Sequence, residues 1–121
     1  MLYLNKSRVN LARYGTMRRQ EDGMARNGKI WKEDVRRVYG SKCVICGSLE
    51  NIQIHHVIFR SNQRVKRYVP NGVPLCHNHH SLNEESAHQN PEWFLKFIIA
   101  RRGLDWWDDL LKKSEGFKKA S

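Results

Sequence analysis

Four cysteine and histidine residues in the middle of the chain have the spacing of metal ligands. Cys43 and Cys46 are separated by two residues, and so are Cys76 and His79. Zn²⁺ prefers tetrahedral thiolate and imidazole ligands, and two ligands at this spacing can bind one ion from a single turn. Gly47 follows the first pair and can adopt the positive φ that often closes such a turn. We predict a structural Zn²⁺ bound by these four side chains.

The fourth ligand of this site has alternatives, because His77 and His80 are also close to Cys76. We choose His79 because it alone repeats the spacing of the first pair. Three cysteines could instead be free buried thiols, or one disulfide with a thiol left over. The odd number and the absence of a signal peptide argue against a secreted disulfide scaffold. Free thiolates fit a reducing cytoplasm.

A second group of candidate residues begins with two adjacent histidines in a predicted strand. The segment 52–59 is rich in β-branched residues and partly alternates, which favours a β-strand containing His55 and His56. Adjacent side chains of a strand point to opposite faces. Both histidines can therefore serve one site only if the chain bends there, with the first binding a metal and the second acting as a base.

The ordered pattern from Cys43 to Glu84 resembles the HNH endonucleases, also called ββα-metal or His-Me finger nucleases. It comprises Cys-x2-Cys, a hydrophobic strand containing His-His, an Asn before a short hydrophobic run, and Cys-x2-His-His. The resemblance covers about a third of the chain. It implies that His55 binds a catalytic metal and that His56 is the general base. It also implies that Asn71 tethers the loop between two strands and helps to orient the base, and that His80 is the second metal ligand.

The chain departs from this family pattern at two positions. Many zinc-bearing members have Cys where this chain has His79, and some have a further His where this chain has Glu84. Residues i and i+4 share one helix face, so Glu84 is a further candidate metal ligand beside His80. A solvated surface Glu is the alternative. His77 and His88 are interpreted as a turn residue and a surface or packing residue.

The resemblance also implies a mechanism. A neutral imidazole with a pKa near its reference value of about 6.5 can deprotonate water at neutral pH, which is the role expected of His56. One divalent ion on His55 and His80 would contact the phosphate and the leaving oxygen, giving 5′-phosphate and 3′-hydroxyl ends. Imidazole ligands favour Zn²⁺, Ni²⁺ or Mn²⁺, whereas family members often use Mg²⁺.

The charge of the chain favours a polyanionic partner. Its 22 Lys and Arg residues exceed its 12 Asp and Glu residues, for a net charge of +10 over 121 residues. Phosphate contacts dominate nucleic-acid affinity. Between the two halves of the motif lies a segment, 60–68, that is basic and contains no acid. We predict that its cations contact DNA phosphates; they are Arg60, Arg64, Lys66 and Arg67.

The remaining elements are expected to flank the motif. Helical periodicity ending at Gly40 predicts a helix at 30–39, and Asn90-Pro91 is a typical helix start. A short strand is expected at 73–75 and a helix near the second metal pair. These elements indicate an α+β fold, and the resemblance implies a small ββα-metal finger stabilised by zinc. Its parts would be a basic N-terminal arm at 1–28 and one nuclease domain at 29–121, with the motif core at 43–84 and helices within 90–113.

These observations predict a metal-dependent endonuclease that hydrolyses double-stranded or branched DNA, by nicking or by double-strand cutting. One alternative is a non-catalytic zinc module that binds nucleic acid, which would need the cysteines and basic residues but neither His56 nor Asn71. Another is an adapter that binds a protein of a larger phage machine through its aromatic C-terminal helices. No apolar run is long enough to cross a membrane, so we expect a cytoplasmic protein, in a bacterial host if it is encoded by a phage.

Overall fold

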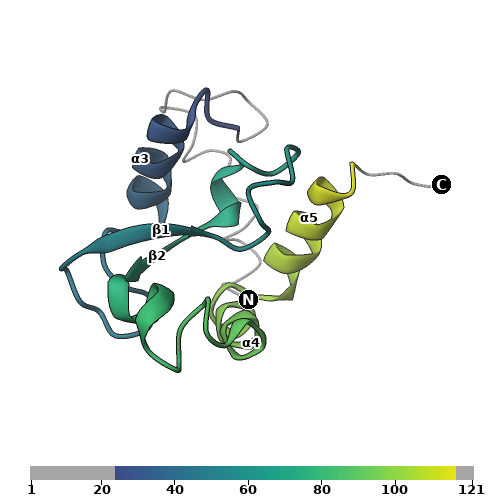
Figure 1. Cartoon of the computed structure of the whole chain (residues 1–121). Helices are drawn as coiled ribbons and strands as arrows, with labels where there is room; N and C mark the ends of the chain where they lie inside the picture. The colour runs from purple at the N-terminus through teal and green to yellow at the C-terminus, as the bar shows by residue number, and fades with distance from the viewer. Residues whose placement is uncertain (1–23, 117–121) are drawn as a thin grey trace.

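A two-stranded hairpin lies between helices in the computed structural model, which describes residues 24–116 (Figure 1). The α+β class is therefore confirmed. Helix α3 lies on one side of the hairpin, and the two C-terminal helices lie on the other (Figure 1). The elements in chain order are α3 (Gly28–Tyr39), β1 (Ile52–His56), the 3₁₀ turn η1 (Val69–Asn71), β2 (Gly72–Cys76), the π-helical turn η2 (Asn78–Leu82), α4 (Pro91–Arg102) and α5 (Leu104–Ser114).

The hairpin is antiparallel, and its register runs from the pair Ile52–Cys76 to the pair His56–Gly72. β1 ends at His56, three residues before the end of the predicted strand. Beyond this point the backbone N–H of Val57 donates to the carbonyl of Asn71 at 3.0 Å, and the chain enters a long loop. The hairpin therefore presents its two histidines at the end of β1, next to that loop.

Helix α3 begins at a capped turn and buries one face against the hairpin. The side chain of Asn27 accepts a hydrogen bond from the backbone N–H of Ile30 at 2.9 Å, and the helix ends before Gly40 at φ +100°. Its buried residues Trp31 and Val35 pack in a cluster with Ile54 of β1. This packing places α3 over the strand face that carries Ile54 and His56, because side chains alternate along a strand.

Gly72 permits the close approach of α3 to β2. A Cβ at this position would lie 2.5 Å from Cγ2 of Val35 and 2.9 Å from Cζ2 of Trp31. We expect Gly72→Ala to lower the free energy of unfolding by about 1–3 kcal/mol, because overpacked cores must shift to accommodate the added methyl group. Denaturant titration measures this loss. Gly28→Ala is the matched control, since a Cβ there meets nothing within 4 Å; equal stability of the two variants would contradict this account.

Helices α4 and α5 cover the other face of the hairpin. Asn90 caps α4 by accepting a hydrogen bond from the backbone N–H of Trp93 at 3.2 Å, which confirms the predicted helix start. Gly103 at φ +98° separates the two helices. Their buried side chains form the main core with β2; this cluster includes Val73, Leu75, Phe94, Ile98, Trp106 and Leu110.

Two predictions about the elements need correction. Residues 24–27 were assigned to the arm, but Ala25 is buried and its N–H donates to the carbonyl of Arg67 at 2.9 Å; residues 1–23 of the arm lie outside the described part. The helix expected at the second metal pair is only the turn η2, because Asn83 leaves the helical region at ψ 157°. Among the described residues, no helix has the length and apolar character to span a bilayer.

Candidate functional site

The structure brings Cys43, Cys46, Cys76 and His79 together as a Cys3His cluster. Their ligand atoms all lie within 4.8 Å of one another. Sγ of Cys46 lies 3.8 Å from Sγ of Cys76, and Nδ1 of His79 lies 3.4 Å from Sγ of Cys76. A tetrahedral zinc ion would separate two sulfurs by about 3.8 Å and a sulfur and a nitrogen by about 3.5 Å. The cluster could therefore hold a structural metal such as zinc.

Local backbone geometry explains how the first pair converges. Gly47 adopts φ +78°, as predicted, and its N–H donates to the carbonyl of Cys43 at 2.8 Å. The N–H of Ile45 points at Sγ of Cys43 at 3.4 Å. Burial raises the pKa of the Cys43 thiol, but backbone N–H groups around the sulfur outweigh it and hold the pKa below the usual value. These donors favour the thiolate that a metal requires.

A second cluster combines three histidines: His55, His80 and His88, which we call the three-histidine cluster. Their ligand atoms also lie within 4.8 Å of one another, a spacing that could hold a metal ion. Nε2 of His88 lies 3.2 Å from Nε2 of His80, and the ring centroid of His55 lies 5.1 Å from each of the other two. The structure thus brings together the two residues predicted to bind a catalytic metal and adds His88 as a third candidate ligand.

His88 was interpreted from the sequence as a surface or packing residue, and its side chain is indeed exposed, but the structure also places it in this cluster. The chain folds back after η2, and the N–H of His88 donates to the carbonyl of His80 at 3.0 Å. Glu84 is exposed and does not belong to this cluster within residues 24–116. Glu84 does not share a helix face with His80, because η2 ends at Leu82. A spacing of eight residues across a loop carries no local signal that could have identified His88.

Burial favours the neutral form of His55 and His80 in this cluster. His55 is 8% exposed, and burial together with the nearby His80, His88 and His56 lowers its pKa to about 3. Burial and the neighbouring His88 and His77 lower the pKa of His80 to about 4. Nδ1 of His80 donates to Oε1 of Gln53, which leaves Nε2 as the ligand atom facing His88. Neutral imidazoles at neutral pH are ready to bind a metal.

We expect His88→Ala to weaken divalent-metal binding at the three-histidine cluster by at least about tenfold. Mutating a residue that only hydrogen-bonds to a metal ligand already lowers metal affinity by about tenfold or more, and His88 would bind the metal directly. The measurement is calorimetric titration of Mn²⁺ into zinc-loaded protein. Glu84→Ala is the control, since the carboxylate lies outside the cluster. If Glu84→Ala weakened binding while His88→Ala left it unchanged, the assignment of the third ligand would be wrong.

His56 is held between α3 and the loop that follows β1. Its ring stacks on Trp31 with centroids 4.1 Å apart and planes 12° apart. Nε2 lies 3.0 Å from the carbonyl oxygen of Lys66. A carbonyl only accepts, so Nε2 carries the proton and Nδ1 carries the lone pair. The ring is therefore fixed in orientation and tautomer, as a general base requires.

Both adjacent histidines line one pocket of about 520 Å³, which we call the edge pocket. From the sequence, both histidines were expected to reach one site only if the strand bent between them. The pairing of β1 with β2 is nevertheless regular through His56. In the described part of the chain β1 pairs only with β2, so its other edge is open. His55 and His56 reach the same pocket around that edge from opposite faces. Its remaining lining residues are Lys32, Ile54, Phe59, Arg60, Ser61, His80 and His88.

Asn71 fastens the loop that carries the carbonyl bound by His56. Its buried side chain accepts from the N–H of Ile58 at 2.8 Å and donates to the carbonyls of Ile58 at 3.0 Å and Val65 at 3.1 Å. The side chain thus ties both ends of the loop together, as predicted for the tether. Because Lys66 follows Val65, the same bonds fix the carbonyl that orients His56.

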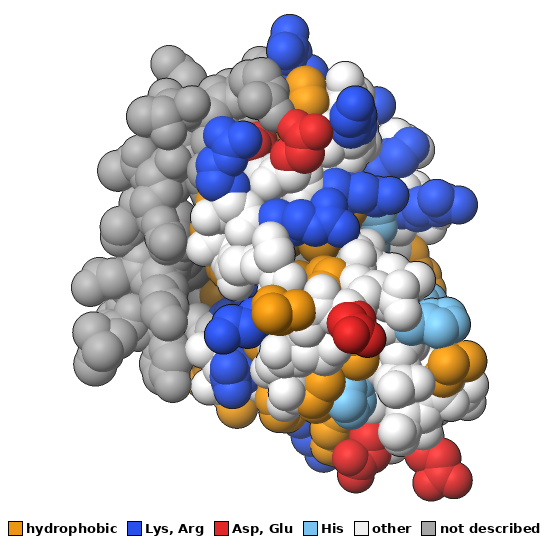
Figure 2. Space-filling view, turned by 90° about the vertical axis from the view of Figure 1, so that its left-hand side faces the viewer, with side chains coloured by type: hydrophobic (Ala, Val, Ile, Leu, Met, Phe, Trp, Pro, Cys, Tyr) orange, Lys and Arg blue, Asp and Glu red, His pale blue; other side chains and the backbone are white. Residues whose placement is uncertain are grey.

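A basic pocket of about 390 Å³ lies on the other side of His56. Three predicted phosphate contacts line it: Arg60, Lys66 and Arg67. Lys29 and Lys32 of α3 also line it, although the sequence analysis did not select them. Lys and Arg side chains gather beside histidines on the face shown in Figure 2. This arrangement concentrates positive charge next to His56.

Arg64 lies apart from this basic pocket. It does not line either pocket that includes His56. Its guanidinium instead lies against Gly116, where an added Cβ would be 2.6 Å from Nε. The prediction grouped Arg64 with the other cations by sequence proximity, whereas the turns of the loop separate them. The structure therefore supports three of the four predicted cations as neighbours of His56.

Comparison with protein-family models, with curated proteins and with solved structures finds no match to this chain. The function of the chain is therefore inferred from the geometry of the two clusters and the two pockets around His56.

Proposed function

We propose that this chain is a metal-dependent endonuclease of the HNH type that hydrolyses DNA. The observation that supports this most strongly is the edge pocket, which places the oriented imidazole of His56 beside the three-histidine cluster. A non-catalytic zinc module has no use for a second cluster of this kind. Fixed groups for activating water and for binding a metal, facing one cavity, are what phosphodiester hydrolysis requires.

In this proposal His55, His80 and His88 hold the divalent ion. When bound there, the ion supplies electrostatic stabilisation of the negative charge that develops on the phosphate and the leaving oxygen. Three protein ligands leave coordination positions open for water and substrate. The Cys3His cluster binds a structural Zn²⁺ and joins the start of the motif to the end of β2, as the positions of Cys43 and Cys76 support.

His56 takes the proton from the attacking water on Nδ1. Its Nε2–H remains bonded to the carbonyl of Lys66, which stabilises the imidazolium that forms. Trp31 prevents the ring from rotating by stacking on it. The cations of the basic pocket bind the backbone phosphates on either side of the scissile bond. These contacts would direct the DNA strand across β1 near its open edge.

The cleavage rate should remain high at pH values somewhat below the usual pKa of histidine, which is 6.5. Burial lowers the pKa of His56 below 6.5; the Lys66 carbonyl opposes this shift, while Arg60 and Lys32 and the Lys66 ammonium reinforce it. A base must be unprotonated, so the rate is full above this lowered pKa and falls only as the pH drops through it. Single-turnover rates from pH 5 to 8 measure the midpoint. A midpoint at or above 6.5 would contradict the described environment of His56.

The nature of the product ends tests the proposed chemistry. Zinc-loaded protein is incubated with a labelled DNA duplex and Mn²⁺, and the nicked product is treated with a DNA ligase. We expect nicks with 5′-phosphate and 3′-hydroxyl ends, which the ligase reseals, and none with His55→Ala. Nicks that the ligase cannot reseal would contradict the mechanism. DNA binding without cutting in any divalent metal would favour the non-catalytic binding module.

A further inference from the structure

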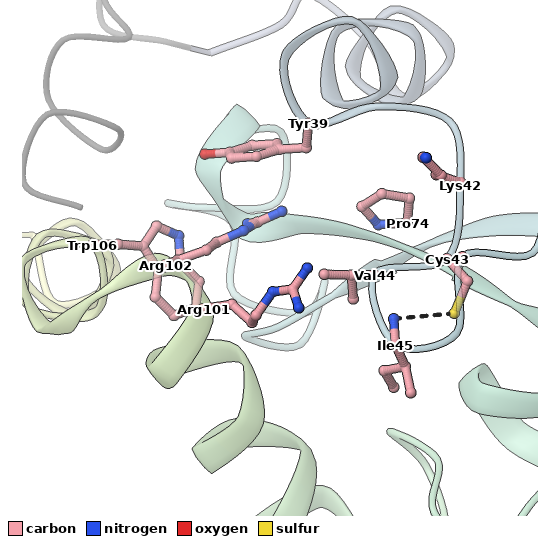
Figure 3. Close-up of a pocket in the computed structure, with 10 residues that line it drawn as sticks. Tyr39, Lys42, Cys43, Val44, Ile45, Pro74, Arg101, Arg102 and Trp106 are labelled. Atoms are coloured by element: carbon pink, nitrogen blue, oxygen red, sulfur yellow. Dashed lines mark hydrogen bonds between the residues drawn. The ribbon is translucent and has the colours of Figure 1, made fainter. Parts of the chain in front are cut away.

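A third cavity borders strand β2 at Pro74, whereas the edge pocket borders strand β1. This rear pocket of about 400 Å³ is lined by the end of α3, the first metal-binding turn, β2 and the helices α4 and α5 (Figure 3). It contains no residue of the three-histidine cluster or of the basic pocket. Its described lining residues are Tyr39, Lys42, Cys43, Val44, Ile45, Gly47, Pro74, Arg101, Arg102 and Trp106.

A buried arginine is built into one wall of this pocket. Arg102 is 7% exposed, and NH1 of its guanidinium donates to the carbonyl of Pro70 at 3.2 Å. The guanidinium carbon lies 3.5 Å from the ring centroid of Tyr39 and 5.5 Å from a ring centroid of Trp106. Aromatic stacking and this hydrogen bond fix the side chain in one position. The wall is therefore a rigid cationic surface.

Two exposed cations lie at different ends of the rear pocket, Arg101 beside Arg102 and Lys42 beyond Pro74 (Figure 3). Lys42 comes from the segment before the metal-binding turn and Arg101 from the end of α4, and both line the cavity (Figure 3). The described lining residues include no Asp or Glu. Val44 and Pro74 lie between Lys42 and the two arginines, and together with Ile45 they form an apolar wall (Figure 3). The cavity thus combines two neighbouring guanidinium groups with an adjacent apolar wall.

We propose that the rear pocket binds one nucleotide, with its phosphate on Arg101 and Arg102 and its nucleoside against the apolar wall, toward Lys42. Guanidinium groups bind phosphate oxygens through paired hydrogen bonds, and apolar walls with a few fixed polar groups are typical of ligand sites. A volume of about 400 Å³ lies within the range of such sites. The nucleotide is either free or part of a nucleic-acid strand. This inference does not depend on the proposed nuclease activity.

Tryptophan indole signals can locate the bound nucleotide. Trp106 lines the rear pocket and its Nε1–H donates to the carbonyl of Pro70 at 2.8 Å. Trp31 lines the basic pocket and its Nε1–H donates to the carbonyl of Tyr68 at 2.9 Å. Zinc-loaded, full-length His56→Ala protein is titrated with a deoxynucleoside 5′-monophosphate, a short single-stranded oligonucleotide or inorganic phosphate, while assigned ¹H–¹⁵N spectra are recorded.

We expect the Trp106 signal to shift with the mononucleotide or the oligonucleotide. A response to the mononucleotide indicates a free nucleotide as the ligand, and a response to the oligonucleotide alone indicates a strand. Replacing both Lys42 and Arg101 with Gln should weaken this binding at least tenfold, whereas Lys96→Gln on the same helix α4, outside the rear pocket, should not. These substitutions spare the buried Arg102 and so preserve the core.

Three results would overturn the proposal. The first is a shift confined to Trp31, which would place binding in the basic pocket. The second is equal affinity for inorganic phosphate and for the nucleotides, because the nucleoside would then make no contact with the apolar wall. The third is unchanged nucleotide affinity in the Lys42→Gln, Arg101→Gln double variant. None of these readouts requires cleavage, so the proposal can fail while the nuclease proposal stands, and the reverse also holds.

Discussion

Replacing His56 with alanine is expected to lower the rate of DNA cleavage by about two to four orders of magnitude, the usual contribution of a general base. The ring is held in one tautomer by the carbonyl of Lys66 and in one orientation by Trp31. No other described histidine combines such a fixed orientation with a place in both the edge pocket and the basic pocket. The loss is measured as a single-turnover rate at saturating metal.

Two controls separate this effect from damage to the fold. His77→Ala changes an exposed histidine that lies outside both metal clusters, and it should cleave at the rate of the unmodified protein. Zinc content and the thermal unfolding midpoint of His56→Ala should show that the protein remains folded. Cleavage by folded His56→Ala at the unmodified rate would require a different base.

Loss of the structural metal is expected to unfold the region around the hairpin. Apparent binding free energies of structural zinc reach about 10–16 kcal/mol, which is comparable to or larger than the total stability of a small domain. Cys43 and Cys76 are buried in the main core with Val73 and Leu75, so separating them disrupts packing as well as ligation. We therefore expect both chelation and Cys43→Ser to abolish the cooperative unfolding transition seen by circular dichroism.

Restoring one equivalent of Zn²⁺ should recover the transition in the unmodified protein and fail to recover it in Cys43→Ser. His88→Ala provides a matched comparison, because it removes a ligand from the three-histidine cluster only. That variant should retain one zinc per chain and its unfolding midpoint. A cooperative transition that persists in zinc-free protein would show that packing alone holds the hairpin, and that the Cys3His cluster has another role.

The sequence was informative where a short, regular spacing determines the geometry. The two-residue spacings of the Cys3His cluster identified all four of its members, and the cap at Asn90 identified the start of α4. Asn71 was predicted as a tether, and its side chain does bridge Ile58 and Val65. In each case neighbouring residues and backbone geometry restrict the outcome.

Features that depend on the path of the chain could not be predicted from the sequence. His88 reaches His80 because the loop after η2 folds back, and Arg64 turns away from Arg60 because the loop after β1 changes direction. The open edge of β1 made a bend unnecessary for bringing His55 and His56 to one pocket. Lys29 and Lys32 were not selected because only the packing of α3 on Gly72 brings them near His56.

Cleavage of supercoiled plasmid tests the central claim most directly. Chelator-stripped protein is reloaded with one equivalent of Zn²⁺ and given Mg²⁺, Mn²⁺ or Ni²⁺, beside His56→Ala treated in the same way. The account predicts that the unmodified protein alone converts the plasmid to nicked or linear DNA, and only when the second metal is present. Intact plasmid in every metal, with DNA binding retained, would contradict the claim that the edge pocket is a nuclease site.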